Sequence, residues 1–212
     1  MKNAMKHAEQ MKELFRRLQK EYAVAEQPKL EPLKALVRAA MSFDVSDAKA
    51  AEAIKHIDRE FVDLNELRVA TELEIQELLG VRYPSIEKRV GLITQSLNAI
   101  FEREHTLSLE RLKLVSKREA RQFLRDLPEM HPFVEGYVML YALEGSAVPL
   151  DETMLGYLRD ESIIEGRMKL DEAQRFVEYH LQPEECHAFF SVLRQAAASE
   201  GEDARDKKKG KG

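Results

Sequence analysis

The chain has 212 residues, of which 44% are hydrophobic and 33% charged, and its net charge is −5 at pH 7. This length suits one large domain or two small helical lobes, and the acidic balance argues against a body built mainly to hold nucleic acid, because phosphate binding depends on Lys and Arg. A single cysteine, Cys186, excludes an internal disulfide and a four-cysteine cluster within one chain. The start has no apolar run after it, and no stretch approaches the roughly 20 apolar residues of a membrane helix, so we expect a cytoplasmic protein with no membrane partner.

Apolar residues recur at helical spacing along the chain, and no segment alternates apolar and polar residues for long. Glycines and prolines fall between the helical segments, where they mark short links. In chain order, the predicted helices span approximately 3–22, 33–41, 47–57, 71–80, 84–100, 116–127, 132–143, 151–158, 170–181 and 183–198. The sequence therefore predicts an all-α fold of about ten to twelve helices.

The last segment, residues 199–212, has no apolar residue larger than alanine. Because it cannot bury apolar surface, we predict a disordered charged tail that follows a helical domain over residues 1–198. Its lysines can bind nucleic acid or an anionic surface, but a solvated tail is the simpler interpretation.

The most informative segment begins at Leu127-Pro128, where one capped helix ends, and closes at Asp151, which stands at the start of a later helix. Residues 127–135 read Leu-Pro-Glu-Met-His-Pro-Phe-Val-Glu, and residues 148–151 read Val-Pro-Leu-Asp. This segment resembles the helix-hairpin-helix DNA glycosylases of the endonuclease III superfamily. The pattern of that family is Leu-Pro-Gly-Val-Gly-x-Lys-Thr-Ala, then an apolar helix, then Pro-x-Asp or Val-Asp.

Two upstream segments extend the resemblance. Residues 39–50 look like the family's Ser-Ala-Gln-x-Thr-Asp helix turn, and residues 79–93 look like its Gly-x-Tyr-x-x-Lys-Ala-x-x-Ile step. The ordered series implies the family fold, an all-α, two-lobed helix-hairpin-helix DNA-glycosylase-like fold with a cleft between the lobes. In this fold we expect the N-terminal helix, the C-terminal helices and residues 30–115 to form one side, and residues 116–150 to form the hairpin region.

The hairpin departs from the family pattern at the residues expected to touch DNA. In the family, backbone N–H groups of the turn approach a phosphate, and glycine permits this because it has no Cβ. Glu129 and His131 occupy the two glycine positions, and Pro132 removes a backbone donor. The resemblance therefore implies a turn that is weak or inert toward DNA, with Met130 and His131 as its remaining contacts. His131 either contacts a phosphate when protonated or stabilises the turn. Arg121, on the preceding helix, either adds a contact or belongs to a solvated ion-pair face.

Three more positions correspond to family residues with known roles. The lysine that forms a Schiff base in lyase members aligns with Phe133, which cannot act as a nucleophile, so the resemblance implies no lyase activity. The glutamine that fills the gap left by a flipped base aligns with Met41, which is either an apolar wedge or a core residue. Tyr83 resembles the family's residue near the base pocket, with a packing role as the alternative.

Asp151 aligns with the family's aspartate, which stabilises positive charge on the sugar or activates water. Aspartate at a helix start is also a common N-cap, so capping and catalysis remain two interpretations of this residue. The four cysteines of the family's iron–sulfur cluster are absent, and we expect no cofactor and no metal site.

Three functions remain open. The first is a divergent endonuclease III-like base-excision repair protein that binds or surveys DNA, lacks the lyase lysine and has weak catalysis or none. The second is a monofunctional DNA N-glycosylase, not an AP lyase, that uses Asp151. The third is a helical protein-interaction scaffold that does not bind DNA. The expected partner in the first two cases is double-stranded or damaged DNA, and we expect a monomer.

Overall fold

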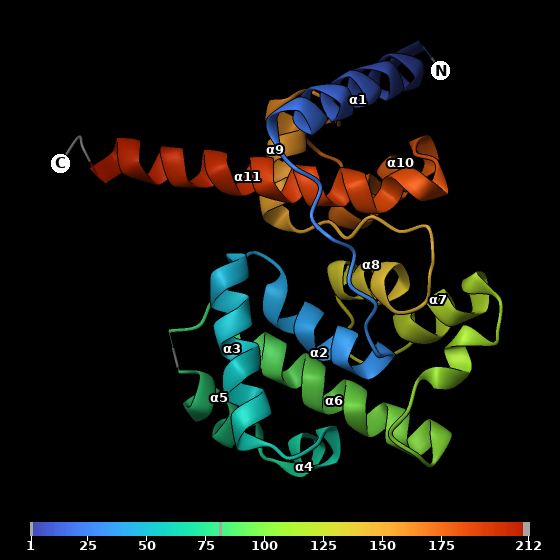
Figure 1. Cartoon of the computed structure of the whole chain (residues 1–212), viewed down its shortest axis with the longest axis vertical. Helices are drawn as coiled ribbons and strands as arrows, with labels where there is room; N and C mark the ends of the chain where they lie inside the picture. Colours follow the sequence, from blue (N-terminus) through green and yellow to red (C-terminus); the bar gives the residue numbers. More distant parts are fainter. Residues whose placement is uncertain (1, 81, 210–212) are drawn as a thin grey trace. The chain divides into compact units, whose positions relative to one another are not determined.

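The computed structural model describes residues 2–80 and 82–209, with side chains described for residues 6–80 and 82–200. Within these residues it contains eleven α-helices, two short 3-10 helices and no strand, which confirms the predicted all-α fold (Figure 1). The elements are α1 (Lys2–Glu21), α2 (Pro32–Ser42), α3 (Asp47–Glu60), α4 (Leu64–Val69), α5 (Glu72–Leu79), α6 (Ile86–Glu104), η1 (Glu110–Lys113), α7 (Lys117–Arg125), α8 (Pro132–Tyr141), α9 (Glu152–Asp160), α10 (Leu170–His180), η2 (Pro183–Glu185) and α11 (Cys186–Lys209). None of the helices in the described part of the chain is long and apolar enough to cross a membrane.

The chain forms two compact units. Unit 1 consists of Met1–Gln27 with Ser146–Gly212, and unit 2 consists of Pro28–Gly145. Two units agree with the predicted two lobes, but their composition differs from the expected grouping, which placed the terminal helices on one side together with residues 30–115. The terminal helices form their own unit, and the hairpin helices belong to unit 2 because α8 packs against α2. Such long-range packing is not visible in local periodicity.

Helix α2 is the centre of unit 2 and packs against α3, α6 and α8. Its buried apolar side chains lie on nearly every face of the helix and are Leu33, Ala35, Leu36, Val37, Ala39, Ala40 and Met41. Glu31 caps the helix by accepting hydrogen bonds from the backbone N–H groups of Leu33 and Lys34. A helix that is apolar on most faces is stable only when buried, so α2 determines how the other helices of unit 2 assemble.

A cation from α6 holds the C-terminus of α2. Arg89 is 1% exposed, and its guanidinium donates hydrogen bonds to the carbonyls of Ala40 at 2.8 Å, Phe43 at 2.5 Å and Pro84 at 2.6 Å. The last carbonyls of a helix lack partners within the helix and carry the negative end of its dipole, so they compensate a buried positive charge. Arg89 therefore fixes the end of α2 and the segment before α6 relative to each other.

Unit 1 is built around α11, which packs against α1 and α9. Phe15 of α1 meets Phe189 of α11 edge to face, with ring centroids 5.3 Å apart, and both rings are buried. Arg17 of α1 forms an ion pair with Glu161, which caps the C-terminus of α9. This aromatic contact and this ion pair thus contribute to the attachment of α1 to α11 and α9.

The last helix is longer than predicted. The sequence predicts a helix that ends at residue 198 and a disordered tail over 199–212, whereas α11 continues to Lys209. Alanine, glutamate and lysine are good helix formers, so the backbone can continue a helix that is already packed at its start. Residues 210–212 lie outside the described residues.

Candidate nucleic-acid interface

The predicted hairpin is present in unit 2, where α7 and α8 pack against each other across a short turn. Glu129 has φ of +53°, in the left-handed region that favours glycine, and it occupies the first glycine position of the family pattern. His131, at the second glycine position, has an ordinary extended conformation with φ of −89° and ψ of 138°. The turn therefore has a glycine-type backbone conformation at one of the two positions. That conformation is strained for Glu129 because its side chain carries a Cβ.

The backbone donors at these two positions have no partner in the part of the chain that the structure describes. Among the described residues, the N–H groups of Glu129 and His131 make no intramolecular hydrogen bond, whereas the N–H of Leu127 donates to the carbonyl of Leu124 at 3.2 Å. A free N–H at a turn that precedes a helix is a donor suited to an anion. The carboxylate of Glu129 is exposed beside these donors and opposes an anion by charge repulsion.

His131 acts as the N-cap of α8. Its Nδ1 accepts a hydrogen bond from the N–H of Phe133 at 3.2 Å, and its ring stacks on Phe43 with centroids 4.3 Å apart and planes 4° apart. Burial lowers the pKa of the His131 imidazole to about 4; the nearby Asp44 acts to raise that pKa, and the cations of Arg89 and Lys88 lower it. His131 is therefore neutral at pH 7 and brings no positive charge to a phosphate.

The residues expected to lie near a flipped base belong to one buried cluster of unit 2. The Tyr83 hydroxyl donates to the carbonyl of Met41 at 2.7 Å, and both side chains are buried. Phe43 receives the guanidinium of Arg89 over its ring at 3.8 Å in addition to its stacking on His131. The structure thus joins Tyr83 to Met41 directly and His131 to Phe43, while the DNA contacts expected of Met41, Tyr83 and His131 stay predictions.

Arg121 pairs with a buried carboxylate on the neighbouring helix. Glu135 of α8 is 3% exposed, and its two oxygens lie 2.7 Å from Nε of Arg121 and 2.8 Å from Nε of Arg125. Both arginines come from α7, so Glu135 clamps the two hairpin helices together. The main interaction of Arg121 in the structure is therefore this ion pair, and its expected contact with DNA stays a prediction.

Phe133, which the motif resemblance aligns with the family's lyase lysine, is fully buried. Its ring lies 6.3 Å from that of Phe43 and 5.8 Å from that of Tyr137, measured between centroids. Aromatic rings at such separations attract each other beyond their burial. The side chain at this position is thus part of the aromatic core of unit 2.

Asp151 lies in unit 1 and is 3% exposed. Its Oδ1 accepts a hydrogen bond from the N–H of Met154 at 2.9 Å, which makes it the N-cap of α9, and its Oδ2 lies 3.8 Å from Nη1 of Arg194 of α11. The loop that leads to Asp151 is also fixed, because the N–H of Val148 donates to the carboxylate of Glu178 at 3.1 Å. The cap is therefore present, and the carboxylate is held at a defined position.

Sequence reasoning missed the buried charges that organise these regions. Arg89 occurs beside Lys88 in a helix with an apolar stripe, and Glu135 is the single charge in the apolar segment of α8. An ionisable residue inside an apolar stripe is a signal for a buried, paired charge, because an unpaired charge is costly to bury. That signal marks Arg89 and Glu135, but it does not reveal their partners.

The described helices, with a hairpin in one unit and an aspartate-capped helix in the other, have the helix-hairpin-helix (HhH-GPD) DNA glycosylase fold, as the sequence predicted. A trapped endonuclease III–DNA covalent intermediate matches with a TM-score of 0.69 at 12% identity, covering 88% of this chain and 84% of that chain. An 8-oxoguanine glycosylase/lyase of Clostridium acetobutylicum in complex with double-stranded DNA matches with a TM-score of 0.70 at 16% identity, covering 91% and 70%.

A third similar structure has nearly the same length as this chain. The 3-methyladenine DNA glycosylase MagIII of H. pylori, bound to 1,N6-ethenoadenine, matches with a TM-score of 0.67 at 15% identity and covers 93% of this chain and 98% of that chain. No protein-family model and no curated protein matches the sequence. At these identities the likeness establishes the fold, and the activity has to be argued from the residues.

Proposed function

We propose that this protein binds double-stranded DNA in base-excision repair and recognises damaged sites without cleaving the strand by a lyase reaction. The observation that carries the proposal is the combination of a DNA-glycosylase fold with the buried Phe133 at the lyase position. Two of the similar structures are complexes with DNA. The fold therefore supports DNA as the partner, and Phe133 supports the absence of the lyase reaction.

The argument against a lyase is chemical. A lyase forms a covalent imine with the sugar and needs an amine nucleophile. Phe133 offers a phenyl ring, and that ring is fully buried among Phe43 and Tyr137. A hydrocarbon side chain neither attacks the sugar nor carries a proton, so the strand should remain intact.

The argument for DNA binding rests on the turn. The N–H groups of Glu129 and His131 are free among the described residues, and free turn donors can hold a phosphate. The exposed carboxylate of Glu129 and the neutral ring of His131 weaken that contact. We therefore expect binding that depends steeply on salt and is weaker than that of a glycine-type hairpin.

A second candidate function is hydrolysis of an N-glycosidic bond without a lyase step, and Asp151 favours it. This carboxylate is buried, oriented by the N–H of Met154 and near the guanidinium of Arg194. A fixed negative charge can stabilise positive charge that develops on a sugar. The neighbouring guanidinium offsets part of that charge, so Asp151 is a weaker stabiliser than an unpaired carboxylate.

Duplex binding at two salt concentrations tests the proposal. Labelled duplexes with and without an abasic site or damaged base are titrated with the full chain at about 50 and about 200 mM salt, the range over which phosphate contacts weaken strongly. The proposal predicts binding at the lower salt, tighter for damaged duplex, with uncut strands. Absence of binding at low salt would favour a protein-interaction scaffold.

The same duplexes distinguish the second candidate. Base release from any damaged duplex, abolished by Asp151→Asn, would establish a monofunctional glycosylase. Asparagine is as good an N-cap as aspartate, so this variant should keep the fold of α9 while it removes the charge. Release that persists in the variant would show that Asp151 is not the catalytic group.

A further inference from the structure

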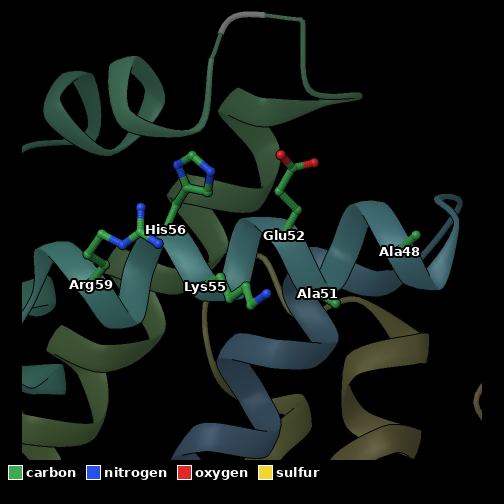
Figure 2. A pocket seen from close by; sticks show the side chains of 6 residues that line it. All are labelled: Ala48, Ala51, Glu52, Lys55, His56 and Arg59. Carbon is green, nitrogen blue, oxygen red and sulfur yellow. The ribbon is translucent and has the colours of Figure 1, made fainter.

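Helix α3 carries a hollow on its outer face that the hairpin and Asp151 do not use. It is lined by Ala48, Ala51, Glu52, Lys55, His56 and Arg59 (Figure 2). These residues recur at spacings of three and four, so they share one side of the helix. The two alanines have short side chains, and Figure 2 shows the longer side chains of Glu52, Lys55, His56 and Arg59 extending from α3 along the same stretch of the helix.

A second hollow adjoins the first and shares Glu52 and His56 with it. Its other lining residues are Lys49, Ala53, Leu79, Gly80, Arg82 and Tyr83. The first hollow has a volume of about 390 Å³ and the second a volume of about 210 Å³, and both are open to solvent. The two hollows therefore suit groups held at the surface, such as single phosphates, better than an enclosed small molecule.

The charge of this surface is opposite to that of the whole protein. Four permanent cations line the two hollows, Lys49, Lys55, Arg59 and Arg82, against the single carboxylate of Glu52. The whole chain has a net charge of −5. Among the described residues, Lys55, Arg59 and Arg82 take part in no ion pair, whereas Arg121 and Arg125 are paired with Glu135. The cations on α3 are therefore available to an anion from outside.

We propose that the two hollows along α3 bind phosphate groups of a nucleic-acid backbone. The inference rests on the proposed DNA binding and adds a second contact surface to it. Within unit 2, α3 packs against α2 and α5, and the hairpin is formed by α7 and α8, so the two surfaces belong to different helices. Cations at intervals along a helix neutralise successive phosphates and release their counterions, which strengthens binding without sequence preference.

The test compares two charge-matched variants of the full chain. Lys55→Ala with Arg59→Ala removes two cations from the hollow, and Lys12→Ala with Arg16→Ala removes two exposed cations from α1. A 20-base-pair duplex is titrated with each variant over a series of salt concentrations. The α3 variant should lower the slope of log affinity against log salt by about two, one for each lost phosphate contact. The α1 variant should leave the slope unchanged, and equal slopes for the two variants would overturn the proposal.

A gain of affinity provides a test that misfolding cannot imitate. Glu52→Gln removes the only carboxylate of the hollows and should tighten duplex binding several-fold at low salt. Unchanged or weaker binding by this variant would count against the proposal.

A third arm separates this inference from the proposed function and from binding of free phosphate. The NMR signals of the His56 ring are followed during addition of sodium phosphate and, separately, of sodium chloride at equal ionic strength. If the chain binds no duplex, the proposed function fails; a phosphate-specific shift of His56 would then retain the α3 surface as a site for free phosphate. Absence of both duplex binding and this shift would overturn the inference as well.

Discussion

The hairpin of unit 2 and Asp151 of unit 1 are the two regions that the motif resemblance relates to glycosylase function, and they differ in the residues that occupy them. At the hairpin, the lyase position holds the buried ring of Phe133, and the second glycine position holds the capping ring of His131. In unit 1, Asp151 is a buried carboxylate that caps α9 and lies near Arg194. An aromatic ring can fill the volume of a reactive side chain without keeping its chemistry.

Asp151 has a structural role that is independent of any catalytic role. Because Asp151 stabilises the start of α9, the helix requires a capping residue at this position whether or not the protein acts on a sugar. The presence of Asp151 therefore shows only that α9 has an N-cap. A catalytic role of Asp151 would have to be shown by its effect on base release. The structural role of each region can be tested by removing one interaction at a time.

The largest effect is expected at Arg89, which supports the hairpin side. Arg89→Met keeps most of the volume but leaves the carbonyls of Ala40, Phe43 and Pro84 without this donor. Each buried carbonyl left unsatisfied costs about 1–3 kcal/mol, so we expect a loss of about 4 kcal/mol in the free energy of unfolding. Urea unfolding followed by circular dichroism measures it. Arg38→Met on the exposed face of α2 is the control, and a loss equal to that of the control would contradict the role of Arg89.

Glu135 should rank second. Glu135→Gln keeps the shape of the side chain but removes the charge that holds Arg121 and Arg125, so α7 should separate more easily from α8. Breaking a buried pair costs about 3–5 kcal/mol, and because both arginines are partly exposed we expect about 2 kcal/mol. Hydrogen exchange of α7 amides measures the local effect. Glu102→Gln on the exposed face of α6 should leave exchange unchanged; equal effects would mean that Glu135 is not a clamp.

The dependence of stability on pH tests the packing of His131 in the hairpin of unit 2. Burial depresses the pKa of the folded His131 from 6.5 to about 4, so the unfolded chain takes up a proton first as the pH falls. The stability contributed by the neutral, packed ring is complete above about pH 6.5 and is lost as the pH falls toward 4. The full shift corresponds to roughly 3 kcal/mol, and because the ring is only partly buried we expect about 1–2 kcal/mol. His131→Asn keeps a capping side chain without a titrating group. Its unfolding free energy should fall less than that of the wild type over this range, and parallel curves would refute the assignment.

The smallest of the stability effects is a gain. Glu129 adopts φ of +53°, so Glu129→Gly should relieve strain and raise the free energy of unfolding by about 1 kcal/mol. It should also strengthen duplex binding, because it removes a carboxylate beside the free turn donors. Glu129→Gln separates the two causes: it should change affinity but leave the strain. A destabilised Glu129→Gly variant would mean that the carboxylate has a structural role.

The sequence was sufficient for the helices and for several of their ends. The helical spacing of apolar residues predicted the elements, and Thr71, Ser116 and Asp151 cap helices in the structure as their types suggest. The order of the motifs predicted the glycosylase-like fold. These features are local, or follow from a resemblance in motif order.

Other features depend on contacts between distant segments. The stack of His131 on Phe43 joins residues far apart in the chain, and the three carbonyls bound by Arg89 come from two separate segments. Residue type alone predicts that a buried arginine needs acceptors, but backbone carbonyls have no signature in the sequence. The cations of α3 can be read from the sequence, but only the folded structure shows that they lie close to Arg82.

Borohydride trapping on duplex DNA with a single abasic site tests the central claim most directly, because borohydride reduces an imine between an amine and the opened sugar to a stable covalent adduct. The full chain should retard the duplex at low salt, give no protein–DNA band on a denaturing gel, and gain no such band on Asp151→Asn. A covalent band in stoichiometric yield, with the strand cut beside the abasic site, would mean that an amine elsewhere in the chain reaches the sugar, and it would contradict the proposed absence of lyase chemistry.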